Sequence, residues 1–141
     1  MAYITESDVK TILPESELIL LTDDSGSGTV NTANLNQCIA DAEAIIDSHL
    51  RPQHSVPLET PGDLVKKIDI ELTIFNLHKR RDTVSDAIRN YYDDNIALLN
   101  KISVGKILID DSTSYRNTGG RIHTNKSSTS KVYTSTETDK F

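Results

Sequence analysis

The residues best suited to chemistry are the oxygen-bearing side chains of residues 23–34. Asp23, Ser25 and Ser27 stand at alternate positions and Gly28 follows them, which is the order of ligands and turn glycine in a calcium-binding loop. A working loop also needs several carboxylates and a glutamate at its twelfth position, where this chain has Asn34. We therefore favour a tight turn between two helices over a metal site.

The strongest basic cluster consists of Lys79, Arg80 and Arg81. One interpretation is contact with DNA phosphates, because such contacts are made mainly by Lys and Arg. The other is the C-terminal end of a helix, where cations interact favourably with the helix dipole and the last carbonyl groups. The body as a whole is acidic, so we favour the helix end and keep these three as possible DNA-proximal residues.

The remaining reactive side chains form no recognisable catalytic or metal-binding motif. The histidines at 49, 54, 78 and 123 lack the spacing of a metal site. Cys38 is the only cysteine, so no intramolecular disulfide can form, and its position on the apolar side of a helix predicts a buried thiol. We expect no enzyme activity, no metal and no cofactor.

Charge divides the chain into an acidic body and a basic tail. Residues 1–110 hold 18 acidic and 10 basic side chains, a net charge of −8, whereas residues 111–141 hold 3 acidic and 5 basic ones, a net charge of +2. Simple solvation of both parts explains this division. The sharper hypothesis is that the tail docks on an acidic surface, either of a neighbouring subunit or of another protein.

The sequence also indicates the compartment in which the protein folds. No apolar run approaches the roughly 20 residues that a membrane span needs. The N-terminus lacks the basic start and apolar core of a signal peptide. We expect a protein that folds in a cytoplasm and makes no membrane contact.

The elements that position these residues are predicted to be helices. Two short helices are expected over residues 6–13, with Thr5 as N-cap, and over 15–21 after Pro14. Three long ones are expected over about 32–49, 61–81 and from Thr83 or Ser85 to 103. Their apolar stripes are Leu35, Ile39, Ala42, Ile46 and Leu50; then Leu64, Ile68, Leu72, Phe75 and His78; then Val84, Ile88, Tyr91 or Tyr92, Ile96, Leu99 and Ile102. The fold class is therefore mainly α, with residues 1–105 forming a small helical bundle.

Residues 106–141 are predicted to form an extended C-terminal arm with short strands. Strands are expected at 106–109 and 131–134, and Thr118-Gly119-Gly120 indicates a hairpin turn. This arm has too few apolar residues for a core of its own, so a neighbouring subunit or partner should hold it, by strand addition. The expected interface residues are Ile107, Leu108, Ile109, Tyr115, Ile122, Val132, Tyr133 and Phe141.

Several segments stand in an order typical of a known family. They are the opening Met1-Ala2-Tyr3-Ile4-Thr5, residues 17–24 with the glycine-rich loop, residues 39–47, the run 77–81, residues 91–99 and the end from Val132 to Phe141. The chain resembles the small head–tail connector, or head-completion, proteins of Mu-like phages and prophages. It departs from them over residues 111–131, in a less acidic loop at 23–31, and in lacking a glycine before Phe141.

The resemblance implies a helical adaptor that forms a ring, usually of twelve copies, below the portal protein. Such a ring sits in the neck of the virion, extends the channel for double-stranded DNA without reading its sequence, and gives tail terminator or neck proteins a docking surface. An acidic channel wall would repel phosphates and let the genome slide. The alternatives are a tail completion or terminator protein and, less favoured, a small DNA-binding phage regulator.

Overall fold

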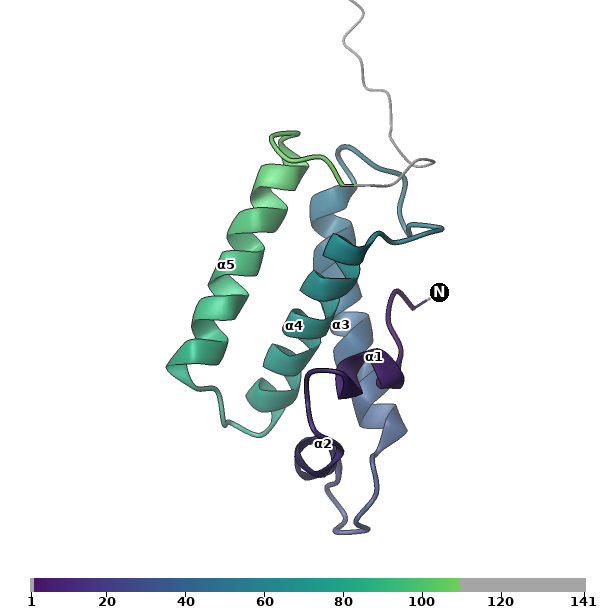
Figure 1. Ribbon diagram of the computed structural model, residues 1–141, viewed down its shortest axis with the longest axis vertical. Helices are drawn as coiled ribbons and strands as arrows, with labels where there is room; N and C mark the ends of the chain where they lie inside the picture. Colours follow the sequence, from purple (N-terminus) through teal and green to yellow (C-terminus); the bar gives the residue numbers. More distant parts are fainter. Residues whose placement is uncertain (1, 110–141) are drawn as a thin grey trace, which may run out of the picture.

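The computed structural model describes residues 2–109, which form a helical bundle (Figure 1). Its helices are α1 (Glu6–Lys10), α2 (Glu15–Thr22), α3 (Thr32–Leu50), α4 (Asp63–Arg80) and α5 (Asp86–Ser103). The mainly α fold with three long and two short helices is thus confirmed. Within the described residues, no helix is both long and apolar enough to cross a membrane.

Local capping explains most of the helix ends. Asn31 and Ser85 each accept a hydrogen bond from the backbone N–H three residues later, and Thr5 begins α1 in a capping box with Asp8. Ser85 therefore begins the last helix, rather than Thr83. The first helix ends at Lys10, earlier than the predicted residue 13, because the chain tightens into turns before Pro14, which cannot continue a helix.

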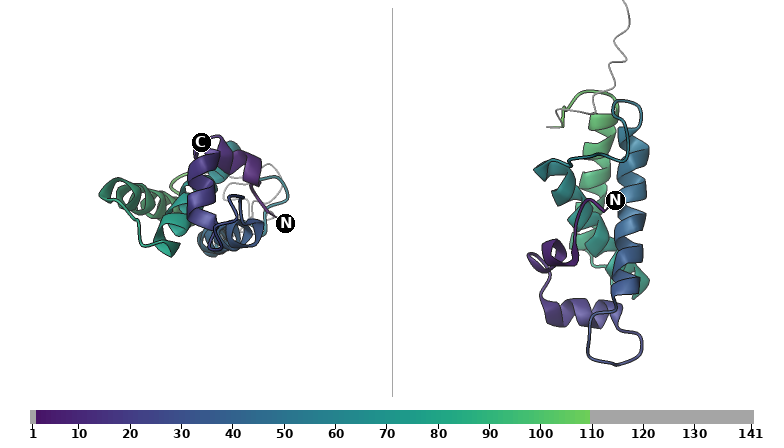
Figure 2. Two further views of the ribbon diagram at one scale, coloured as in Figure 1. Left: turned by 90° about the horizontal axis from the view of Figure 1, so that it is seen from below. Right: turned by 90° about the vertical axis from the view of Figure 1, so that its right-hand side faces the viewer.

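α4 is the central helix of the bundle. It contacts α1, α2, α3 and α5, whereas the long helices α3 and α5 flank it (Figure 1). α2 lies crosswise to the long helices, and together with α1 it covers the lower halves of α3 and α4 (Figure 2). The first half of α5 receives no such cover.

The apolar side chains form two adjoining clusters. The upper cluster joins α3, α4 and α5 with Tyr3, Leu58 and Ile109, and the lower cluster joins α1 and α2 with α3 and α4. All five predicted stripe positions of α3 are buried. On α5, only Leu99 and Ile102 of the predicted stripe are buried, because the start of that helix has a neighbour on one side alone.

The segment that follows α5 differs from expectation. Gly105 ends the helix with a left-handed φ of 73°, as its place in the sequence predicted. Within residues 2–109 the segment 106–109 forms no strand, and its pairing with a neighbouring subunit stays a prediction. Instead, Ile109 is buried in the upper cluster and Ile107 packs against it, whereas Leu108 is exposed. The predicted hairpin and the strand at 131–134 lie outside the described residues.

Tyr3 joins three separate parts of the fold. Its backbone N–H donates to Glu43, its hydroxyl donates to Asp47, and the same hydroxyl accepts the Leu58 N–H at 2.9 Å. The N-terminus, α3 and the 51–62 connection are therefore tied at one phenol oxygen. Burial and the bond to Asp47 raise the pKa of Tyr3, so the hydroxyl keeps its proton.

Replacing Tyr3 with Phe should lower the free energy of unfolding by about 1–3 kcal/mol, because the buried N–H of Leu58 loses its acceptor. Urea unfolding followed by circular dichroism measures the change. Tyr91→Phe, which removes a hydroxyl from an exposed tyrosine, is the matched control and should change little. Equal stabilities of the two variants would contradict this role for Tyr3.

Candidate functional site

A cluster of charged side chains fastens the α2–α3 loop to the end of α4. The Arg80 guanidinium contacts the Asp24 carboxylate and donates to the Leu21 carbonyl at 3.1 Å. Arg81 lies 3.4 Å from the other Asp24 oxygen and donates to the Asp23 carbonyl. We call Asp24, Arg80 and Arg81 the arginine clamp. The two motifs that the sequence presented separately, the glycine-bearing loop and the basic cluster, are thus one structural unit.

Asp23 shapes the loop from within. One carboxylate oxygen accepts the N–H and hydroxyl of Ser25 at 3.0 Å, and the other accepts the Gly28 N–H at 2.7 Å. The bond from Gly28 is the main reason that the pKa of Asp23 lies far below its usual value. Gly26 and Gly28 both have φ of 73°, a conformation that a larger side chain would strain.

These contacts bear directly on the calcium interpretation. The carboxylates that would bind a cation already have donors: Asp23 holds the turn, and Asp24 faces two guanidinium groups. Asn34, at the twelfth loop position, donates to Asp24 at 3.1 Å and to the Thr22 carbonyl at 2.8 Å. Among the described residues, no group of three or more His, Cys, Asp or Glu could hold a metal ion. The arrangement is that of a turn joined to a helix end.

The rest of the basic cluster has mixed roles. His78, one position before Lys79, is buried, with Nδ1 3.1 Å from the Thr83 hydroxyl and Nε2 3.8 Å from Glu17. The Lys79 side chain has no hydrogen-bond or ion-pair partner within the part of the chain that the structure describes. DNA contact by Lys79, Arg80 and Arg81 stays a prediction, and the clamp leaves Lys79 as the residue most available for it.

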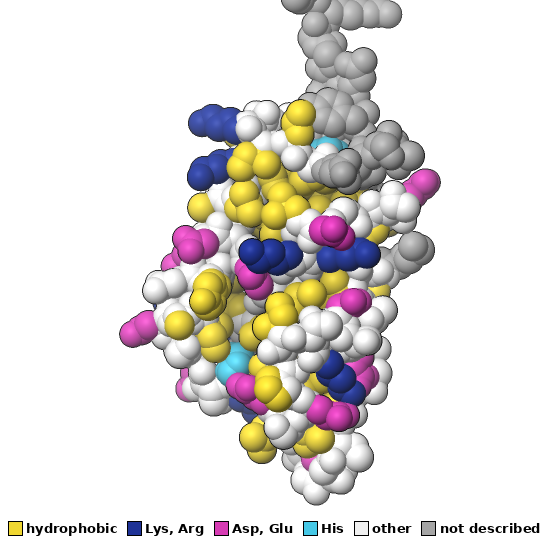
Figure 3. Space-filling view, in the orientation of Figure 1, with side chains coloured by type: hydrophobic (Ala, Val, Ile, Leu, Met, Phe, Trp, Pro, Cys, Tyr) yellow, Lys and Arg dark blue, Asp and Glu magenta, His cyan; other side chains and the backbone are white. Residues whose placement is uncertain are grey.

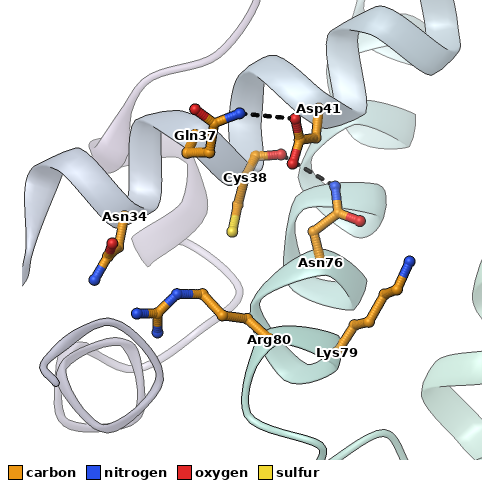
Figure 4. A pocket seen from close by; sticks show the side chains of 7 residues that line it. All are labelled: Asn34, Gln37, Cys38, Asp41, Asn76, Lys79 and Arg80. Atoms are coloured by element: carbon orange, nitrogen blue, oxygen red, sulfur yellow. Dashed lines mark hydrogen bonds between the residues drawn. The ribbon is translucent and has the colours of Figure 1, made fainter.

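A polar pocket lies between α3 and α4, beside the clamp (Figure 4). It measures about 320 Å³ and is lined by Asn34, Gln37, Cys38, Asp41, Asn76, Lys79 and Arg80. Gln37 donates to Asp41 at 2.9 Å, and Asn76 donates to the Cys38 carbonyl at 3.1 Å. Cys38 is buried, as predicted, and burial raises the pKa of its thiol, which disfavours the reactive thiolate.

An apolar groove opens on the other side of α4. It also measures about 320 Å³, and its walls are Ile12 after α1, Glu71 and Ile74 on α4, and Ile88 and Tyr91 on α5. Ile12 is 55% exposed and Tyr91 is 61% exposed. Apolar side chains are visible over this face of α1, α4 and α5 (Figure 3). We call it the α4–α5 groove. The sequence placed Ile88 and either Tyr91 or Tyr92 on an inner stripe. In the structure Tyr92 packs against the upper cluster, whereas Ile88 and Tyr91 border open space.

Residues 3–122 match the family described as Bacteriophage Mu, Gp36. The chain belongs to this bacteriophage Mu Gp36 family. A search of curated proteins finds no match. Membership confirms the expected origin in Mu-like phages and indicates a role in the structure or assembly of the phage particle.

The family match covers all the helices, the arginine clamp and the α4–α5 groove. It also includes Tyr115 and Ile122 of the predicted interface, whereas Val132, Tyr133 and Phe141 lie beyond its end. These five residues lie outside the described part of the structure. Of the other three, Ile109 anchors the start of the tail in the upper cluster, and Leu108 is 66% exposed.

Sequence reasoning overlooked a buried carboxylic acid on α4. Asp69 is 0% exposed, and neither of its carboxylate oxygens has a hydrogen-bond partner among the described residues. Burial raises its pKa to about 8, and the negative charges of Glu43 and Asp47 on α3 add to the shift. Its position offered a signal, because Asp69 comes four residues after Val65 and three before Leu72, both of which are buried.

Replacing Arg80 with Met should weaken the clamp and lower the free energy of unfolding by about 1 kcal/mol, since the lost ion pair is partly exposed. Hydrogen exchange of residues 23–31 should rise, because the Leu21 carbonyl loses its Arg80 donor and Asp24 keeps only Arg81 and Asn34. Lys79→Met is the control and should leave both quantities unchanged. Unaltered hydrogen exchange in the Arg80 variant would show that the loop keeps its structure without the clamp.

Stability should fall as the pH rises from about 4 to 8, because of Asp69. An unfolded aspartate has a pKa of about 3.9, whereas the folded value is about 8, so the folded protein holds a proton that the unfolded chain releases. Asp69→Asn removes this titration. The free energy of unfolding of the variant, relative to that of the parent, should increase by on the order of 2–5 kcal/mol between pH 4.5 and pH 8. Urea unfolding at the two pH values measures the difference.

The control for this titration is Asp94→Asn, which changes an exposed carboxyl on α5. Its stability should follow the pH dependence of the parent. If the Asp69 variant also followed the parent, the buried acid would not be titrating in this range.

Proposed function

We propose that the chain is a head–tail connector subunit, a non-enzymatic virion protein that forms a ring, of twelve copies by the resemblance, below the portal. The chain belongs to the Mu Gp36 family and is divided into an acidic helical body and a basic tail, and this division is the main support for the proposal. The body carries an open apolar groove, and the tail carries separated apolar residues. Both are features of a subunit that is completed by neighbours.

The charge of the body supports a position of the protein along a channel through which DNA slides. Residues 1–110 carry a net charge of −8, and the two arginines of the strongest basic cluster face Asp24. The Asp24 carboxylate therefore partly offsets the charge of these two arginines within the subunit. A ring of such bodies would present a repulsive wall to the genome and allow its passage without sequence recognition.

The ring geometry supports stable assembly from modest contacts. When each copy contacts its neighbour through the same pair of surfaces, a closed ring satisfies every surface at once. Each contact formed raises the effective concentration for the next. The ring would then present a repeated surface to the portal above and to the tail terminator or neck proteins below. One weak contact per subunit would be multiplied around the ring.

The chemistry of the pockets supports a role without catalysis. The polar pocket contains a thiol whose pKa is raised, and the acid with the most perturbed environment, Asp69, is enclosed in the core. A tail terminator built on a sheet is less favoured, since residues 2–109 are helical. A DNA-binding regulator is less favoured because the clamp engages Arg80 and Arg81.

A stop codon in this gene should yield finished tails separate from heads that have lost their DNA, because the connector is missing from the joint. Electron microscopy of the lysate shows the particles. Full-length protein supplied from a plasmid should restore joined particles. Filled, stable heads beside missing or overlong tails would instead place the protein in the tail.

A plasmid that supplies only residues 1–110 tests the tail in the same strain. This body should fold, with a helical circular dichroism spectrum, but it should fail to restore joined particles because the tail cannot make its contacts. Normal particles with the truncated protein would refute the role assigned to residues 111–141.

A further inference from the structure

The α4–α5 groove is an apolar surface with an acidic edge. Glu71 lies in its wall, where Asn95 donates to one carboxylate oxygen at 2.6 Å. The nearest cation, Lys67, is mostly exposed and 4.0 Å away, so it neutralises Glu71 weakly. Asp94 is exposed three residues after Tyr91 and therefore shares that side of α5. A suitable occupant would combine apolar anchors with adjacent positive charge.

The tail has this composition. Its apolar residues stand beside cations in the pairs Tyr115-Arg116, Arg121-Ile122, Lys131-Val132 and Lys140-Phe141. The net charge of residues 111–141 is +2, opposite to that of the body. Each pair could place an apolar side chain in the groove and a cation near Glu71 or Asp94. The match is one of chemical type, apolar with apolar and cation with carboxylate.

The length of the tail brings the groove of a neighbouring copy within reach. The chain leaves the body at Ile109, beside the end of α5, whereas Ile88 and Tyr91 stand near the start of that helix. An 18-residue helix is about 27 Å long, so the groove lies toward the far end from the departure point. Thirty-one extended residues reach on the order of 100 Å, which is ample for a neighbour.

We propose that residues 111–141 of one copy dock in the α4–α5 groove of the next copy. Each subunit then gives one tail and receives one, a head-to-tail contact that closes when the ring is complete. The inference rests on the proposed ring and identifies the contact that joins its members. The burial of Ile109 fixes the point from which each tail departs.

The test places a photo-crosslinking amino acid, p-benzoylphenylalanine, at position 91 of the full chain in the infecting phage. Tyr91 is 61% exposed, so the replacement should leave the fold intact. After irradiation of purified particles, we expect products of at least twice the subunit mass, with position 91 joined to residues 111–141. The same amino acid at Ala44, exposed on α3 and outside the groove, is the control and should not capture the tail.

The outcomes separate the two proposals. Protein present in particles but crosslinked at position 91 to other segments, or to its own tail at the mass of one subunit, overturns the docking and leaves the connector role standing. Absence of the unaltered protein from purified particles overturns the connector role and the ring with it. Products that join position 91 to the tail of a second copy support the docking.

A pair of substitutions provides a second measurement in particles. Tyr91→Ser removes an apolar side chain from the groove, and Leu20→Ser removes one that is 72% exposed and lies outside its walls. If the tail docks as proposed, Tyr91→Ser should lower the yield of joined particles at least tenfold, and Leu20→Ser should not. Equal yields would overturn the docking.

Discussion

The rest of the body depends on the central position of α4. An amphipathic helix usually buries one stripe and leaves the opposite face in water. α4 instead contacts every other helix of the described fold, so the upper and lower apolar clusters both rest on it. This position explains why Asp69, Thr73 and His78 are buried along with its apolar residues. A helix enclosed on several sides buries polar groups that its sequence would otherwise leave in solvent, and the raised pKa of Asp69 follows from that enclosure.

The same packing determines which surface stays open. α1 and α2 cover the lower parts of α3 and α4 and stop short of α5, which leaves Ile88 and Tyr91 without a neighbour on one side. Phe75 and Tyr92 stack with ring centroids 4.1 Å apart and hold the two helices together behind the groove. The opening is therefore a consequence of helix lengths, since α1 has 5 residues and α2 has 8. Because its walls are apolar, a partner that fills the groove would bury apolar side chains that are otherwise exposed to water.

The sequence predicted what local chemistry decides and missed what distant contacts decide. Helical periodicity and capping residues such as Asn31 and Ser85 located the helices, and the stripe of α3 is buried as expected. Only Leu99 and Ile102 of the six positions in the α5 stripe are buried, because periodicity identifies an apolar face without showing whether another element covers it. The arginine clamp joins Asp24 to Arg80 across 56 positions, a distance over which no local pattern acts. No strand forms at 106–109 within the described residues, because β propensity alone supplies no pairing partner.

The clamp also links the fold to the charge of the assembled particle. Arg80 and Arg81 contact Asp24 of the acidic turn, so they are not free to pair with carboxylates elsewhere on the body. The tail is the segment in which cations outnumber carboxylates, with 5 basic and 3 acidic side chains. A ring in which each tail crosses to the next body would set this positive charge against carboxylates such as Glu71, at the contacts between copies. The basic tail would then attract the acidic body of the next copy, and the acidic bodies would repel DNA along the channel. The uneven distribution of charge along the sequence would thus serve both assembly and passage of the genome.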